Sequence, residues 1–272
     1  MPAKSVTPAT VRRLIQDITV GKTAADVKTR LRGRAVVTGG AGTAARVADL
    51  LSGIMTWAVE EEIIDSNPVH GVKRYHGEPR DRFLSRDEMA RLGRVLDQGT
   101  DADGQPINPM ARTIVRLLLL TGCRASEIEN LRWSEVDLAQ RCLRLEDSKT
   151  GKSLRALGRE AIEVLSQQPL VNVSPYVFPG ARGEGPYQGT KREIRRVMAA
   201  AGIANAGRHA LRHTFASIAS ECGYSDATIA GLLGHKGRGV TSRYVHRPDS
   251  ALLSAAEGVC TTIADAISVP SV

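Results

Sequence analysis

Aromatic residues make up only 4% of this 272-residue sequence. Proteins that bind single-stranded nucleic acid stack bases on aromatic side chains, so this composition argues against that class. Uninterrupted apolar runs such as Leu117 to Leu120 are short, far from the about 20 residues that a membrane helix requires. The N-terminal residues contain no apolar segment that resembles a secretory signal. We therefore expect a cytoplasmic protein that makes no membrane contact.

Cysteine is also scarce. The four cysteines lie far apart and form no C-x-x-C pair, which favours reduced intracellular thiols over a disulfide framework or a zinc site. The triplet Gly21-Lys22-Thr23 is not a P-loop, because Gln16 stands where that motif has its first glycine. We expect no metal and no cofactor.

Positive charge is abundant and unevenly distributed. The formal net charge is +8, and residues 1–48 hold nine basic side chains against two acidic ones, Asp17 and Asp26. Clustered positive charge neutralises duplex phosphates, so this segment is expected to contact duplex DNA; a merely solvated basic face is the alternative. The candidate DNA-binding residues are Arg12, Arg13, Lys22, Lys28, Arg30, Arg32, Arg34 and Arg46.

Patterning divides the chain into a short and a long domain. Apolar residues between Thr43 and Glu62 recur at helical spacing, and Asn67-Pro68 ends that pattern. The polar stretch 77–83 has the character of an interdomain linker. We therefore expect a helical domain over residues 1–76 and a second domain over residues 84–272.

The second domain is predicted to be mainly α-helical with one small antiparallel sheet. Ser85 and Glu88 form a capping box, Met110–Leu120 has the all-round apolar character of a buried helix, and Gly122 stands where that helix would end. The sheet is expected as a hairpin of residues 142–146 and 153–157. Further helices are expected from Arg159, Thr190, Arg208 and Ser225 and over Asp249–Ile267.

Four local features of the second domain could carry chemistry. Arg124 lies in the corner before a helix that Ser126 and Glu129 are predicted to cap, and Lys149 lies at the predicted hairpin tip. The other two features are the segment His209-Ala210-Leu211-Arg212-His213 and a tyrosine that follows a Gly-His pair. Taken singly, such residues are most often solvated or packed.

The two histidines at positions 209 and 213 have the spacing of a zinc-binding helix. That interpretation is disfavoured, because Ala210 stands where a metalloprotease has glutamate. The alternative is that His209 and Arg212 share one helix face and present a hydrogen-bonding group and a guanidinium to one oxyanion.

Together these residues fit phosphoryl transfer to a tyrosine. Arginine stays protonated and binds two oxygens at once, which suits the charge that develops on a phosphodiester in its transition state. A tyrosine hydroxyl, with a pKa of about 10, attacks only if its proton is removed. The leaving 5′ oxygen needs a proton, which a lysine of lowered pKa can supply.

The chain resembles the tyrosine recombinases of the phage-integrase family over roughly residues 84–266. That family has, in order, an arginine, a hairpin lysine, His-x-x-Arg, a histidine or tryptophan, and a tyrosine. The chain matches within TGCRASE, SKTGK, HALRH and LLGH, with the tyrosine nine residues after the last histidine. The matching residues are Arg124, Lys149, His209, Arg212, His235 and Tyr244.

The resemblance implies a metal-independent enzyme whose catalytic domain follows a helical core-binding domain. It implies that Tyr244 attacks the scissile phosphate to leave a 3′-phosphotyrosyl link. His209 would accept or relay the tyrosine proton, and Lys149 would protonate the leaving oxygen. The implied activity is site-specific DNA recombination or integration.

The remaining site residues are implied to bind the phosphate. Arg124 and Arg212 would hold its non-bridging oxygens, His235 would hydrogen-bond to it, and Glu127 would orient Arg124. Two alternatives stay open: a catalytically idle, truncated DNA-binding remnant of a mobile element, and a type IB topoisomerase-like enzyme.

The resemblance also implies how the protein assembles on duplex DNA. Residues 1–76 are shorter than the family's core-binding domain usually is, which predicts an N-terminally shortened form. The C-terminal tail helix would dock on a neighbouring protomer and give a homo-tetramer on DNA; packing within its own chain is the alternative. The apolar stripe of that helix consists of Ala251, Leu252, Ala255, Val259, Ile263 and Ile267.

Overall fold

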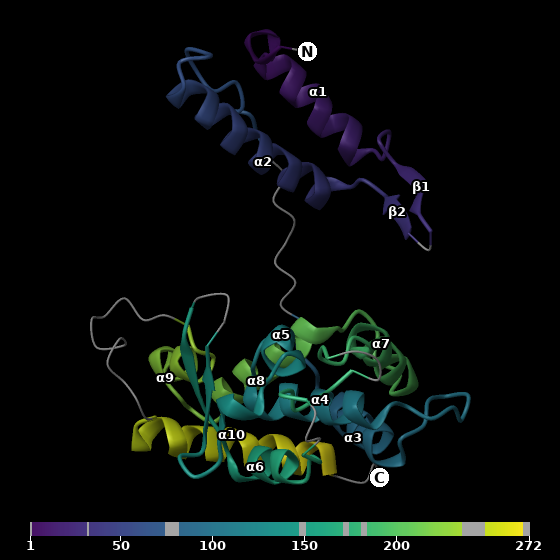
Figure 1. Cartoon of the computed structure of the whole chain (residues 1–272), viewed down its shortest axis with the longest axis vertical. Coiled ribbons are helices and arrows are strands. Elements are labelled where there is room, and N and C mark those ends of the chain that lie inside the picture. The colour runs from purple at the N-terminus through teal and green to yellow at the C-terminus, as the bar shows by residue number, and fades with distance from the viewer. Residues whose placement is uncertain are drawn as a thin grey trace. The chain divides into compact units, whose positions relative to one another are not determined.

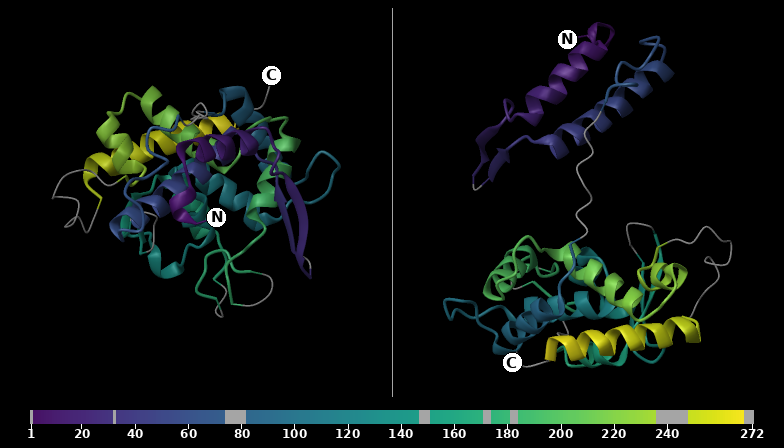
Figure 2. Two further views of the ribbon diagram at one scale, coloured as in Figure 1. Left: turned by 90° about the horizontal axis from the view of Figure 1, so that it is seen from above. Right: turned by 180° about the vertical axis from the view of Figure 1, so that it is seen from behind.

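The chain forms two compact units, residues 1–80 and 81–272 (Figures 1 and 2). The computed structural model describes residues 2–31, 33–73, 82–146, 151–170, 174–180, 184–235 and 248–268. We call the two parts the N-terminal unit and the C-terminal unit.

The N-terminal unit consists of two packed helices joined by a β-hairpin. Thr7 caps the first helix by accepting the backbone N–H of Thr10, and Pro8 begins that helix, where no backbone donor is needed. A small core of Val11, Met55, Val69 and Val72 lies in this unit. Its elements are a 3₁₀ turn (Ala3–Ser5), α1 (Pro8–Thr19), β1 (Ala25–Arg30), β2 (Gly33–Val37) and α2 (Ala41–Glu60).

The hairpin β1–β2 was not predicted. Its strands pair antiparallel, with Lys28 opposite Arg34, and every residue of the hairpin strands except the half-buried Gly33 is exposed. The alternation of Ala25 and Val27 with Asp26 and Lys28 is the signal from which it could have been found.

The C-terminal unit is mainly α-helical with a small antiparallel sheet, which confirms the predicted fold class. The sheet has the order β3–β4–β5, and its two longer strands are the hairpin that the alternating pattern predicts. The elements are α3 (Arg86–Gln98), α4 (Pro109–Thr121), α5 (Ala125–Glu129), a 3₁₀ turn (Trp133–Glu135), β3 (Val136–Asp137), β4 (Cys142–Leu145), β5 (Ser153–Ala156), α6 (Arg159–Ser166), α7 (Thr190–Ala200), α8 (Arg208–Glu221), α9 (Asp226–Leu232) and α10 (Ser250–Ser268).

Helix α4 lies at the centre of this unit and contacts α5, α6, α7, α8 and α10. Its residues from Leu117 to Thr121 are all buried, as the apolar pattern predicts. It ends at Gly122, whose φ of +59° lies in the left-handed region that favours glycine. The predicted capping box of Ser85 and Glu88 is also present at the start of α3. These local signals therefore place the chain corner that carries Arg124.

Helix α10, yellow in Figures 1 and 2, packs along the C-terminal unit against α3, α4, α6, α8 and α9. Gly93 lets the backbones of α3 and α10 touch, since a Cβ there would lie 1.7 Å from the carbonyl oxygen of Ile267. Ala255, Val259 and Ile263 are buried in the core. These buried residues of the stripe pack within their own chain, where five helices surround them, which agrees with the alternative of packing within the chain. Docking of this helix on a neighbouring protomer stays a prediction.

The length and apolar composition of α10 would by themselves suit a membrane span. Its buried residues belong to the main hydrophobic core of the C-terminal unit. A core helix has the same composition, so its hydropathy is explained by packing.

Candidate active site

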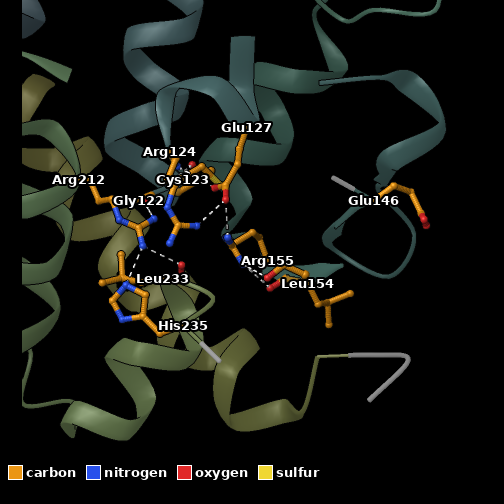
Figure 3. A network of polar contacts seen from close by, with 12 residues as sticks. Gly122, Cys123, Arg124, Glu127, Glu146, Leu154, Arg155, Arg212, Leu233 and His235 are labelled. Carbon is orange, nitrogen blue, oxygen red and sulfur yellow. Dashed lines mark hydrogen bonds and ion pairs between the residues drawn. The ribbon is translucent and has the colours of Figure 1, made fainter. Parts of the chain in front are cut away.

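Three of the six predicted catalytic residues come together at one place in the C-terminal unit (Figure 3). Arg124 lies at the start of α5, Arg212 in α8 and His235 after α9, and their side chains point toward one another. His209 lies on the same helix as Arg212, three residues earlier, and is exposed. Lys149 and Tyr244 lie outside the described residues.

Arg124 is held by Glu127 in two ways. The carboxylate accepts the backbone N–H of Arg124 at 2.8 Å and a guanidinium N–H of the same residue, also at 2.8 Å. The helix therefore begins at Ala125, and the prediction that Ser126 and Glu129 cap it is wrong. The reason is that Glu127 satisfies the backbone donor of Arg124 while it orients the arginine side chain.

Arg212 joins three segments that are far apart in the sequence. Its guanidinium donates to the carbonyl oxygens of Gly122 at 2.6 Å and Leu233 at 2.9 Å, and one nitrogen lies 3.0 Å from Nε2 of His235. These contacts fix both the end of α4 and the turn after α9. Burial, with repulsion from Arg124, lowers the pKa of Arg212 to about 10, so it remains protonated at neutral pH.

His235 is held as a neutral ring. Arginine has only donors, so the ring nitrogen that faces Arg212 must be the acceptor. Burial and the charges of Arg212 and Arg124 lower the pKa of His235 below its usual value, which keeps the ring neutral at pH 7. The remaining proton is then on Nδ1, from which the side chain can donate to an oxyanion.

Sequence reasoning missed a further member of this cluster, Arg155 in β5. Its side chain is fully buried and donates to Oε1 of Glu127 at 2.9 Å. The alternation of side chains along β5 could have revealed it. Arg155 lies on the same face of the strand as the buried Leu157, whereas Leu154 and Ala156 lie on the other face. Strand period would therefore place this arginine on the inward face.

The cluster carries excess positive charge in partly buried surroundings. The cluster holds three guanidinium groups, those of Arg124, Arg155 and Arg212, and the single carboxylate of Glu127, which pairs with the first two. Such an arrangement stabilises an anion far better than water would, since the donors are already oriented. Its geometry suits a tetrahedral oxyanion such as a phosphodiester. Within the described ranges, no group of three His, Cys, Asp or Glu side chains is placed to hold a metal ion.

The predicted DNA-binding residues of the N-terminal unit are exposed wherever the structure describes them. Two of them form ion pairs: Lys22 lies 3.3 Å from Asp17, and Arg34 hydrogen-bonds Asp26 and lowers the pKa of that carboxyl. Arg32 lies outside the described residues. The other exposed candidates are Arg12, Arg13, Lys28, Arg30 and Arg46. Exposure agrees with a DNA-facing surface, and DNA contact by these residues stays a prediction.

Comparison with known proteins places this site in a family. Residues 82–250 match the model of the phage integrase family. Over 151 residues the chain is 30% identical to the prophage integrase IntF of Escherichia coli K12, a match that covers 54% of this chain and 32% of that protein. It is 28% identical over 214 residues to a tyrosine recombinase XerC of Mycobacterium sp. strain KMS, covering 75% of this chain and 71% of that one.

Solved structures show the same fold. A lambda integrase fragment, residues 75–356, bound as a dimer to a COC′ core site, superposes with a TM-score of 0.63 at 20% identity; the match covers 92% of this chain and 85% of that one. The Tn1549 transposon integrase in complex with circular intermediate DNA gives 0.60 at 16% identity, covering 94% and 86%.

Proposed function

Because this chain belongs to the phage integrase family, we propose that it is a site-specific tyrosine recombinase that cleaves and rejoins duplex DNA through a 3′-phosphotyrosyl intermediate. The observation that carries the proposal is the cluster of Arg124, Arg212 and His235, which come from three separate segments and face one position. The names of the relatives favour a recombinase over a topoisomerase.

In the proposed reaction the cluster stabilises the phosphate. Arg124 and Arg212 bind its non-bridging oxygens, and the neutral ring of His235 donates a hydrogen bond from Nδ1. Charge increases on those oxygens as the transition state forms, and fixed cations then contribute most. Glu127 keeps Arg124 in place throughout.

The proposed bond changes involve the other three residues. The hydroxyl oxygen of Tyr244 forms a bond to phosphorus and passes its proton to His209, while the bond from phosphorus to the 5′ oxygen breaks and that oxygen takes a proton from Lys149. The phosphotyrosyl ester conserves the energy of the broken bond, so rejoining consumes no nucleotide triphosphate. A 5′ hydroxyl from a second duplex reverses the step and completes strand exchange.

We assign duplex DNA binding to both units, with the N-terminal unit as the core-binding domain, and we place the reaction in the cytoplasm. On DNA we propose a homo-tetramer. We propose that its protomer contacts involve α10 through the residues of that helix that stay accessible, such as Ala251, because Ala255, Val259 and Ile263 lie in the core of their own chain.

A trapping experiment tests the enzymatic proposal. The probe is a pool of duplexes with a randomised core and a nick just 3′ of it, so that the short 5′-hydroxyl product diffuses away after cleavage and religation fails. An adduct that survives denaturant, recovered and sequenced, is the expected result. A chain that binds these duplexes and never forms an adduct would instead be the idle remnant.

Replacement of Lys149 by alanine is expected to slow cleavage by about 10²–10⁴-fold, the usual contribution of a general acid. A substrate whose 5′ bridging oxygen is replaced by sulfur should restore most of the rate, because a thiolate leaves without a proton. Single-turnover adduct formation on both substrates measures this. If the sulfur substrate gives no recovery, Lys149 is not the acid.

Replacement of Lys28 and Arg30 in the exposed hairpin by alanine is expected to weaken duplex binding by a similar factor for all sequences. The slope of log affinity against log salt should fall by about two, since two phosphate contacts are lost. The matched control removes two exposed arginines of the C-terminal unit, Arg86 and Arg159. Fluorescence anisotropy at several salt concentrations measures both variants, and equal slopes for the two would place DNA binding elsewhere.

A further inference from the structure

Three segments of the C-terminal unit meet at the guanidinium of Arg155 (Figure 3). Within β5 it donates to the carbonyl oxygen of Leu154 at 3.2 Å and to the hydroxyl of Ser153. From α5, Glu127 accepts at 2.9 Å. From the turn after α9, Gly234 lies directly against it, since a Cβ there would stand 1.4 Å from a guanidinium nitrogen. Arg155 of β5 therefore contacts both Gly234, which precedes His235, and Glu127, which follows Arg124.

Oε1 of Glu127 is shared between two arginines. It accepts from Arg124 at 2.8 Å and from Arg155 at 2.9 Å, and the carboxylate side chain is only 2% exposed. One carboxylate can offset only one of these two charges. With Arg155 present, the pair of cations keeps a net positive charge at Arg124; without it, the buried anion would offset Arg124 alone.

Arg155 itself cannot touch DNA in this arrangement, because its side chain is completely buried. Any effect on the reaction must therefore pass through its neighbours. The residue that links it to the phosphate position is Glu127, which holds Arg124 at both the backbone and the guanidinium.

We propose that Arg155 is a positioning residue for strand cleavage: it balances the charge of Glu127, so that the positive charge of Arg124 stays available to the scissile phosphate. This inference rests on the proposed function. The alternative is that the ion pair of Arg155 and Glu127 only stabilises the fold. The two explanations differ in the expected effect of the charge at position 127. Under charge balance, the effect of losing Arg155 depends on whether position 127 is an anion.

The experiment measures single-turnover adduct formation on nicked duplexes recovered from the trapping pool, at saturating protein, with duplex affinity measured in parallel. Arg155→Met is expected to slow cleavage by on the order of 10–100-fold while affinity changes less than about threefold. Arg155→Lys keeps the charge and should recover most of that loss. The matched control is Arg144→Met in the neighbouring strand β4, which breaks the pair with Asp137 and should leave the rate unchanged.

The decisive variant is Arg155→Met combined with Glu127→Gln. The single oxygen of glutamine keeps one of the two hydrogen bonds from Arg124 and carries no charge. Both variants with glutamine share the loss of the other bond, so the double variant should cleave faster than Arg155→Met and at least as fast as Glu127→Gln alone. A double variant slower than Glu127→Gln would overturn charge balance. The comparison between the double variant and Glu127→Gln still tests charge balance if Arg155→Met does not fold, because neither of these two variants has a carboxylate at position 127.

The outcomes separate the inference from the proposed function. If the wild-type chain gives no adduct with any duplex in the pool, the recombinase proposal fails, and the inference fails with it. If the wild-type chain gives adducts and Arg155→Met cleaves at the wild-type rate, the function stands and the role of Arg155 is refuted.

Discussion

Replacement of Tyr244 by phenylalanine is expected to abolish the covalent adduct while duplex affinity changes less than about twofold. The substitution removes one oxygen, which in the proposed reaction forms the bond to phosphorus. No general base or cation can replace a missing nucleophile, and loss of one costs on the order of 10⁶ in rate in a well-studied hydrolase. The aromatic ring stays, so binding is preserved. Denaturing gels and anisotropy on the trapped duplexes measure the two quantities.

The matched control is Tyr176→Phe. Tyr176 is half-buried, its ring lies against the guanidinium of Arg132, and it takes no part in the proposed reaction. This variant should form adduct at the wild-type rate. Adduct formation by Tyr244→Phe would show that another residue is the nucleophile.

The second large effect is expected for Arg212→Lys, which should slow adduct formation by on the order of 10³-fold. Arg212 donates to Gly122 and Leu233 while it also faces His235. A lysine ammonium is a single point charge and cannot span these acceptors and a phosphate together. Retained positive charge should limit the loss of duplex affinity, so the deficit is expected in the cleavage rate at saturating protein.

Arg116→Lys serves as the control for this substitution. Arg116 lies in α4 and pairs with Asp97, so the same change there alters an arginine that faces an acidic side chain instead of the cluster. Its adduct formation should match the wild type. A rate for Arg212→Lys within tenfold of the wild type would mean that the guanidinium does not bind the phosphate in the transition state.

Much of the fold follows from local pattern. The capping box at Ser85, the buried run before Gly122 and the alternation of the β4–β5 hairpin all depend on residues within a few positions of one another. Backbone geometry and side-chain periodicity act at that range, so a single sequence reveals them. The order of the six candidate residues likewise lies in the sequence and is sufficient to indicate the family.

Tertiary structure decided what those local patterns could not. The apolar pattern of α10 left open whether this helix packs within its own chain or on a partner, and the structure shows its buried residues covered by five helices of its own chain. The environment of Arg155 depends on Glu127, 28 residues away, and that of Arg212 on Gly122, 90 residues away. Charged groups are tolerated in a core only where opposite charges and backbone acceptors from other segments surround them. Such partners are brought together by folding. Chain order therefore indicated the two candidate arginines and Glu127, whereas only the fold showed that Gly122 and Leu233 hold Arg212 and that Arg155 pairs with Glu127.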